Sequence, residues 1–159
     1  MLTAREICAI KEKRHNASLK KIIESKIKKI RVFNDRMPKK FLIWQEPYFC
    51  YSGIRTRENP PYDRRDLVAT PDLFVATSEP SYLLIIESKL SNHQLALNKM
   101  KEELKRCGKY LLEMPEQTEK FLSAHGLSER EINDLEIALC GVMPTRRGIR
   151  ELYYEKLFD

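Results

Sequence analysis

Apolar residues recur every three or four positions along residues 17–33, and lysines occupy many of the positions between them. This spacing places the apolar side chains on one face of an amphipathic helix. Residues 93–113 show the same spacing, and Ser91 or Asn92 can cap the start of that helix. We therefore predict two long helices that flank a central region with a different pattern.

Shorter helical signals accompany these two. Residues 116–125 form a helical pattern that Gly126 can terminate. The sequence S-E-R-E from Ser128 is a capping-box pattern for one further helical turn. Residues 3–14 are predicted to form an earlier helical piece.

Elsewhere the apolar residues come in short blocks that are rich in branched and aromatic side chains, which predicts β-strands. The expected strands are residues 41–51 (bent or interrupted at Pro47), 72–77, 82–90, 135–143 and, after a basic turn, 151–158. Residues 52–70 combine glycine, prolines and many charges, so we predict a long loop there. The order of elements predicts an α/β fold with a mixed central sheet flanked by helices.

The strands at 72–77 and 82–90 form the most informative local pattern, because four residues with turn chemistry connect them. Antiparallel register across a four-residue turn places Asp72 opposite Glu87. Directly opposed residues on one face have β-carbons about 4.5–5.5 Å apart. Side chains alternate along a strand, so Lys89 shares the face of Glu87. Three ionisable side chains are therefore expected to project together.

Bringing these charged side chains together between apolar residues costs free energy unless another group compensates their charge. The rest of both strands is apolar on both faces, which is typical of interior strands. Two ionised carboxylates about 5 Å apart repel by about 3 kcal/mol at an effective dielectric constant near 20. Such a pair persists if a cation bridges it, if one acid is protonated, or if Lys89 compensates the charge. An ordinary ion pair of Glu87 with Lys89 at the sheet edge is the purely structural alternative.

The same three side chains suit phosphodiester hydrolysis. A hard divalent ion such as Mg²⁺ prefers carboxylate ligands together with water and phosphate oxygens. The bound ion polarises the phosphate and lowers the pKa of a bound water. A lysine ammonium can orient that water or stabilise charge on the phosphorus.

Pro71-Asp72, a gap, and then Glu87-Ser88-Lys89 resemble the hallmark of the PD-(D/E)XK nuclease superfamily. The resemblance implies the restriction-endonuclease-like αβββαβ core of that superfamily. It also implies that Asp72 and Glu87 are ligands of Mg²⁺ or Mn²⁺ and that Lys89 is the catalytic lysine.

The resemblance covers about residues 17–143, but only the motif itself is specific. Many members add an acidic ligand from the first core helix, for which Glu24 on the helix and Glu46 on the first strand compete here. The Q-x-x-x-Y motif of the RecB-like branch is not found, since Gln94 is followed four positions later by Asn98. The subgroup is therefore not identified.

Charge is unevenly distributed along the chain. Residues 11–40 hold twelve Lys or Arg and three acids, a local net charge of +9 in a chain whose total is +6. A basic block of this kind indicates a polyanionic partner, and its alternative is a solvated helix face. We expect the partner to be double-stranded DNA, held by phosphate contacts that do not read sequence. The expected contact residues are Lys20, Lys21, Lys28, Lys29, Arg64, Arg65, Lys101, Lys105, Lys109, Arg146 and Arg147.

Other classes of protein are disfavoured. No apolar run reaches the roughly 18 residues that span a bilayer, and the N-terminal residues carry charges where a signal peptide is apolar. We expect an intracellular protein without a membrane partner, in its own or a host cytoplasm. Assembly as a homodimer stays open. The cysteines show no C-x-x-C pair and are predicted to be small core residues: Cys8, Cys50, Cys107 and Cys140.

These observations favour one nuclease domain over residues 1–159, with residues 1–16 as an N-terminal extension. The closest alternative is a non-catalytic DNA-binding or accessory protein on a degenerate nuclease fold. A third reading is an unrelated α+β interaction protein with an accidental E-x-K sequence. The intact Asp72, Glu87 and Lys89 favour the enzyme, because loss of activity usually removes one of them.

Overall fold

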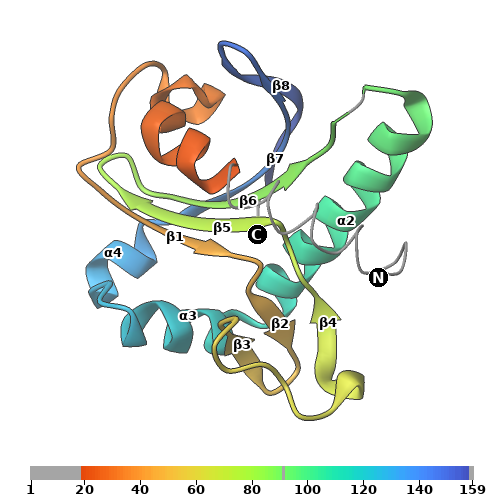
Figure 1. The fold of residues 1–159 in the computed structure, drawn as a ribbon. Helices are drawn as coiled ribbons and strands as arrows, with labels where there is room; N and C mark the ends of the chain where they lie inside the picture. Colours follow the sequence, from red (N-terminus) through yellow and green to blue (C-terminus); the bar gives the residue numbers. More distant parts are fainter. Residues whose placement is uncertain (1–18, 91, 158–159) are drawn as a thin grey trace.

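A five-stranded mixed sheet forms the centre of the fold (Figure 1). The computed structural model describes residues 19–90 and 92–157. In spatial order the strands are β1 (Lys40–Gln45), β5 (Leu73–Ser78), β6 (Tyr82–Ser88), β7 (Glu136–Thr145) and β8 (Gly148–Leu157). Neighbouring strands run antiparallel except β6 and β7, which are parallel.

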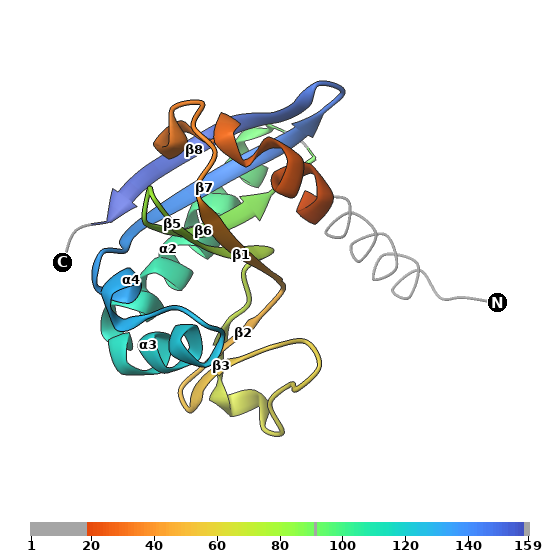
Figure 2. The same cartoon turned by 90° about the vertical axis from the view of Figure 1, so that its left-hand side faces the viewer.

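Helical segments cover both faces of this sheet. Residues 19–33 pack on one face, and α2 (Gln94–Glu113) packs on the other, where it contacts β6 and β7. Figure 2 shows the segment 19–33 on the opposite side of the sheet from α2 and α3 (Pro115–Ala124). The short helix α4 (Glu129–Asn133) follows α3. The predicted α/β class, with a mixed central sheet flanked by helices, is confirmed.

The prediction of one continuous helix over residues 17–33 is wrong in its second half. Residues 19–26 are helical, but 3₁₀ turns follow at Ile27–Lys29 and Arg31–Phe33, and Ile30 between them is extended with φ −70° and ψ 135°. The buried positions explain the change, because their spacing shortens from four to three residues after Ile27. A 3₁₀ helix has about three residues per turn, so it keeps such positions on one face. Residues 1–18, with the expected extension and its helical piece, lie outside the described residues.

A second, three-stranded sheet occupies much of the predicted loop at residues 52–70. Its strands, in the spatial order β3-β2-β4, are β2 (Tyr48–Cys50), β3 (Gly53–Arg55) and β4 (Leu67–Ala69). The expected strand 41–51 is divided between the two sheets at Glu46, whose φ is +48°. The interruption near Pro47 was predicted; the second sheet was not. Strands of three residues are too short to give a clear periodic signal.

Several local signals are confirmed. The helix predicted from residue 93 begins at Gln94, but its N-cap is His93, whose side chain accepts a hydrogen bond from the Leu95 amide, and not the predicted Ser91 or Asn92. Ser128 and Glu131 form the complete capping box of α4. The described cysteines Cys50, Cys107 and Cys140 are buried and free, as expected of core residues. No helix in residues 19–90 or 92–157 is both long and apolar enough to cross a membrane.

Candidate active site

The site lies at the open end of the β5–β6 hairpin. Leu73 pairs with Ile86 and Phe74 with Ile85, so the register continues to Asp72 opposite Glu87, as the four-residue turn predicts. The Asp72 amide donates a hydrogen bond to Glu87 Oε1 at 3.1 Å. The Ser88 amide donates one to Asp72 Oδ2 at 2.8 Å. Backbone hydrogen bonds therefore fix the two carboxyl groups side by side.

The two faces of the hairpin separate as the alternation of side chains predicts. Phe74, Ala76, Leu83 and Ile85 belong to the apolar cluster that includes α2. The residues between them belong to the cluster formed with residues 19–33. Because Asp72 and Glu87 continue the first set, their side chains project toward α2. Glu87 is only 3% exposed, in a position that an apolar residue normally fills.

Helix α2 brings a further acid, Glu103, to this pair. The helix approaches the sheet closely at Gly141, which pairs with Glu87 on the neighbouring strand. A β-carbon added at Gly141 would lie 2.1 Å from Met100 Sδ, so the missing side chain leaves room for Met100 of α2 to pack directly on β7. Glu103 follows Met100 by three positions and thus lies on the same side of α2. Glu103 was not among the predicted site residues, although its place beside the buried stripe of α2 is visible in the sequence.

Burial dominates the electrostatics of the pair. It raises the pKa of the Glu87 carboxyl well above its usual value, and the charge of Asp72 and a hydrogen bond with Glu103 raise it further. Burial also raises the pKa of Asp72, against the Ser88 amide, which lowers it. The buried Glu87 and the half-buried Asp72 therefore hold one proton between them more readily than two negative charges.

Lys89 lies where the strand leaves the core. Its Nζ is 3.5 Å from Glu103 Oε2, and its side chain is 24% exposed. Its amide donates to the Val142 carbonyl at 3.1 Å, which extends the β6–β7 ladder past Ser88. The alternative of an ordinary Glu87–Lys89 ion pair is not what the structure shows, because Lys89 pairs with Glu103. The ammonium nevertheless acts on the site, because its charge lowers the pKa of Asp72.

The two candidates for an additional acidic ligand have other partners. Glu24 forms an exposed ion pair with Lys20 at 3.8 Å. Glu46 lies at the same end of the sheet as Asp72, since its amide donates to the Asp72 carbonyl at 2.9 Å. Its carboxylate, however, is 3.6 Å from Arg57 Nε. The acid that raises the pKa of Asp72 and Glu87 is Glu103, not either candidate.

The donor set fits a hard divalent ion held by two carboxylates. The described residues contain no group of three or more His, Cys, Asp or Glu side chains arranged to hold a metal ion. Asp72 and Glu87 remain as an adjacent pair, and Glu103 is engaged with Lys89. Mg²⁺ commonly takes one or two protein carboxylates and completes its shell with water and phosphate oxygens. A cation there would stabilise the ionised forms of both carboxyls, which burial disfavours.

The basic residues expected at DNA divide between the two sides of the sheet. Lys20, Lys21, Lys28 and Lys29 lie on the segment that covers the face away from the carboxylates, and Lys29 is paired with Asp35 at 2.9 Å. Lys20 also lines a cavity of about 180 Å³ at edge strand β1, together with Arg57 and Gln45. The Gln45 side-chain nitrogen is buried there without a hydrogen-bond partner among the described residues.

Lys101, Lys105 and Lys109 lie on α2, which covers the carboxylate side. The Lys101 ammonium lies 5.4 Å from the ring centre of Tyr153 on β8. Tyr153 pairs with Gly141 of β7, which is the second strand from β5. Lys109 is paired with Glu113 at 3.8 Å.

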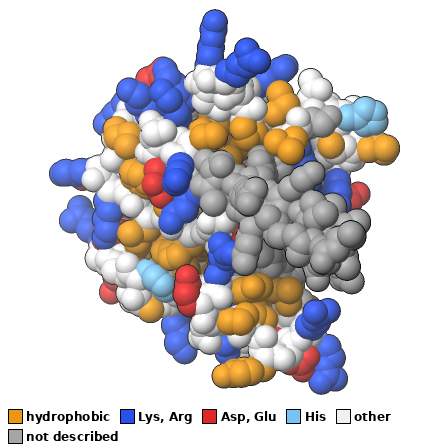
Figure 3. All heavy atoms as spheres, viewed as in Figure 1, with side chains coloured by type: hydrophobic (Ala, Val, Ile, Leu, Met, Phe, Trp, Pro, Cys, Tyr) orange, Lys and Arg blue, Asp and Glu red, His pale blue; other side chains and the backbone are white. Residues whose placement is uncertain are grey.

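The remaining expected contacts are arginines at two exposed turns. Arg146 and Arg147 form the tip of the β7–β8 hairpin. Lys and Arg side chains gather at the upper edge of the face in Figure 3, where Figure 1 places this tip. Arg64 and Arg65 lie in the 3₁₀ turn before β4, and Arg65 is paired with Asp63 at 3.0 Å.

Comparison of the chain with protein-family models, with curated proteins and with solved structures finds no match in any of the three. The site is therefore interpreted from its own residues.

Proposed function

We propose that the protein is a metal-dependent nuclease that hydrolyses phosphodiester bonds of double-stranded DNA. The observation that carries this proposal is the adjacent Asp72–Glu87 pair, in which Glu87 is buried and Asp72 half-buried, with Lys89 at its rim. A stability argument does not account for these two adjacent carboxyls, because desolvation raises the pKa of both. Sites with such strongly shifted groups are more often functional than structural.

The order of elements supports a PD-(D/E)XK assignment within this proposal. A helical segment precedes β1, β5 and β6, and α2 and β7 follow, which agrees with the αβββαβ arrangement that the motif implies. The small β2-β3-β4 sheet is then an insertion between the first and second core strands. The Pro71-Asp72 and Glu87-Ser88-Lys89 elements lie at the same end of adjacent strands.

Each side chain has a distinct role in the proposed reaction. Asp72 and Glu87 would hold Mg²⁺ or Mn²⁺, which supplies Lewis-acid activation of the phosphate and of a bound water. Lys89 donates to the attacking water or to a non-bridging phosphate oxygen, so its charge offsets negative charge that develops on the phosphorus. Glu103 is a positioning residue, since its carboxylate lies 3.5 Å from the Lys89 ammonium.

Cleavage of linear and supercoiled duplex DNA with and without Mg²⁺ tests the proposal. The wild-type protein should cleave only with the metal, and Glu87→Gln should be inactive. Glu113→Gln, an exposed change on the same helix that carries Glu103, is the matched control and should keep full activity. DNA binding by the wild-type protein without cleavage under any divalent metal would contradict the nuclease and favour the non-catalytic DNA-binding alternative.

A further inference from the structure

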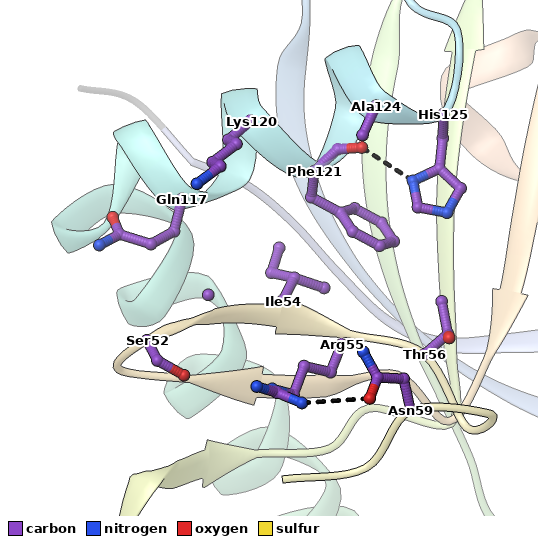
Figure 4. Close-up of a pocket in the computed structure, with 11 residues that line it drawn as sticks. Ser52, Ile54, Arg55, Thr56, Asn59, Gln117, Lys120, Phe121, Ala124 and His125 are labelled. Atoms are coloured by element: carbon purple, nitrogen blue, oxygen red, sulfur yellow. Dashed lines mark hydrogen bonds between the residues drawn. The ribbon is translucent and has the colours of Figure 1, made fainter.

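A cavity of about 400 Å³ lies between α3 and β3 and shares no residue with the carboxylate site (Figure 4). Figure 4 shows Lys120, Phe121 and His125 entering it from α3, opposite Ile54 and Arg55 of β3. None of the described residues that line it is Asp or Glu. The cavity therefore combines cationic side chains with an apolar surface and contains no acid to neutralise them.

Arg55 is held in place by neutral acceptors. Its Nη1 donates to Asn59 Oδ1 at 3.3 Å and to the Pro60 carbonyl at 3.4 Å. Within the described residues, neither Arg55 nor Lys120 forms an ion pair with a carboxylate. An arginine fixed by neutral oxygens keeps its full charge for a ligand.

His125 presents one ring nitrogen to the cavity. Its Nδ1 lies 2.8 Å from the Phe121 carbonyl oxygen, which only accepts, so Nδ1 carries a hydrogen and Nε2 remains for a ligand. The ring packs against Phe121 at 4.2 Å and edge-on against Trp44 at 5.3 Å between ring centres. Both aromatic contacts restrict the orientation of the imidazole.

One acid, Asp66, is hydrogen-bonded to a residue that lines the cavity but does not itself line it. Asp66 accepts hydrogen bonds from the Ser52 amide, at 3.0 Å, and from the Ser52 hydroxyl. Ser52 lines the cavity, whereas Asp66 does not. These bonds tie the β2–β3 turn to the segment before β4.

We propose that this cavity binds a nucleotide through its phosphate and its base. Arg55 and Lys120 are suited to the phosphate, because guanidinium and ammonium groups form charge-assisted hydrogen bonds with it. His125 Nε2, which accepts when Nδ1 carries the hydrogen, is suited to a hydroxyl or N–H group of the nucleotide. Phe121 and Ile54 offer the apolar surface against which a base packs. The volume is within the range of small-molecule sites and exceeds what inorganic phosphate alone would fill. The nucleotide is either a free mononucleotide or one unit of a strand.

The only tryptophan of the chain reports on this cavity. Trp44 contacts both His125 and Phe121, at 5.3 Å and 4.9 Å between ring centres. Thymidine monophosphate, added without divalent metal, should change Trp44 fluorescence in a saturable way. Arg55→Gln and Lys120→Gln should each weaken binding about tenfold, as expected for the loss of one charged hydrogen bond. Lys39→Gln, which removes an exposed charge paired with Glu79, is the matched control and should bind normally.

Oligonucleotides distinguish the two sources of the nucleotide. If thymidine monophosphate competes with a short single strand for the cavity, the ligand is a free or terminal nucleotide. If only the strand binds, and its binding depends on Arg55 and Lys120, the ligand is an internal nucleotide of the strand. Unchanged affinity for both probes in a folded Arg55→Gln/Lys120→Gln variant, or no saturable change with either probe, overturns the proposal. Glu87→Gln should leave this binding intact, so its result is independent of the proposed nuclease.

Discussion

Two adjacent residue pairs of the β5–β6 hairpin share backbone register but differ in chemistry. Leu73 and Ile86 project toward residues 19–33 and are fully buried. Asp72 and Glu87, one residue further along, project toward α2. Burial stabilises the first pair through the hydrophobic effect, whereas in the second it raises both pKa values. The same hairpin thus serves the core on one face and carries costly ionisable groups on the other.

The helical segments that cover the two faces of the sheet also differ in the chemistry that they bring to it. Residues 19–33 contribute only apolar side chains to their buried cluster. Helix α2 contributes apolar side chains as well, but it approaches the sheet over Gly141 and places Glu103 beside the carboxyls. A comparison of substitutions on the two faces therefore separates stability from chemistry.

Ile86→Ala should produce the largest loss of stability. It leaves a cavity on the apolar face, and such changes cost about 2–5 kcal/mol of unfolding free energy. Urea denaturation measures this loss. Glu87→Gln, at the next position of the same strand, should not destabilise the protein at pH 8, because wild-type folding at that pH costs the protonation of Glu87 and glutamine avoids this cost. An equal loss in both variants would show that Glu87 serves the core just as Ile86 does.

Lys89→Ala should lower the turnover number for duplex cleavage at least about 100-fold and leave DNA affinity nearly unchanged. A group that acts mainly in the transition state affects the chemical step more than binding. Single-turnover kinetics together with binding in EDTA measure the two quantities. Lys39→Ala, which removes an exposed lysine paired with Glu79, is the control. Weaker binding with normal turnover at saturation would make Lys89 a phosphate contact only.

The stability of the metal-free protein should fall as the pH rises above the ordinary glutamate pKa of 4.5. The pKa of Glu87 is raised by folding, so the folded protein binds more protons than the unfolded chain above this pH. The limiting slope for one proton is about 1.4 kcal/mol per pH unit. Glu87→Gln should flatten the curve, and Mg²⁺ should restore stability at high pH in the wild type alone. A wild-type curve as flat as that of Glu87→Gln would contradict the shifted pKa.

Replacement of Lys20, Lys21, Lys28 and Lys29 by Ala should have the smallest effect, a change in the salt dependence of DNA binding. Each lost phosphate contact should reduce the log–log slope by about 0.9. The measurement uses the Glu87→Gln protein, so that cleavage does not distort binding. The matched set is Lys101, Lys105 and Lys109 on the carboxylate side. An unchanged slope for the first set would assign those lysines to solvation and move the DNA path to α2.

Local chemistry made much of this hairpin predictable. The four-residue turn set the register, and alternation along the strands set the faces, so Asp72 and Glu87 were placed together correctly. Periodicity also predicted α2, α3 and β7 close to their observed bounds. It failed for residues 27–33, where a spacing of three signals 3₁₀ turns, and for the three-residue strands of the second sheet.

By itself the sequence determined the order of elements, the pairing of β5 with β6 and the adjacency of Asp72 and Glu87, because these depend on neighbours along the chain and on the period of a strand. Only the tertiary structure decided that Glu103 meets these carboxyls and that Lys89 pairs with it, since both depend on how closely α2 packs over Gly141. It also formed the cationic cavity, whose Arg55 and His125 are seventy positions apart in the sequence. Contacts between distant segments follow from the packing of whole elements, which no local pattern specifies.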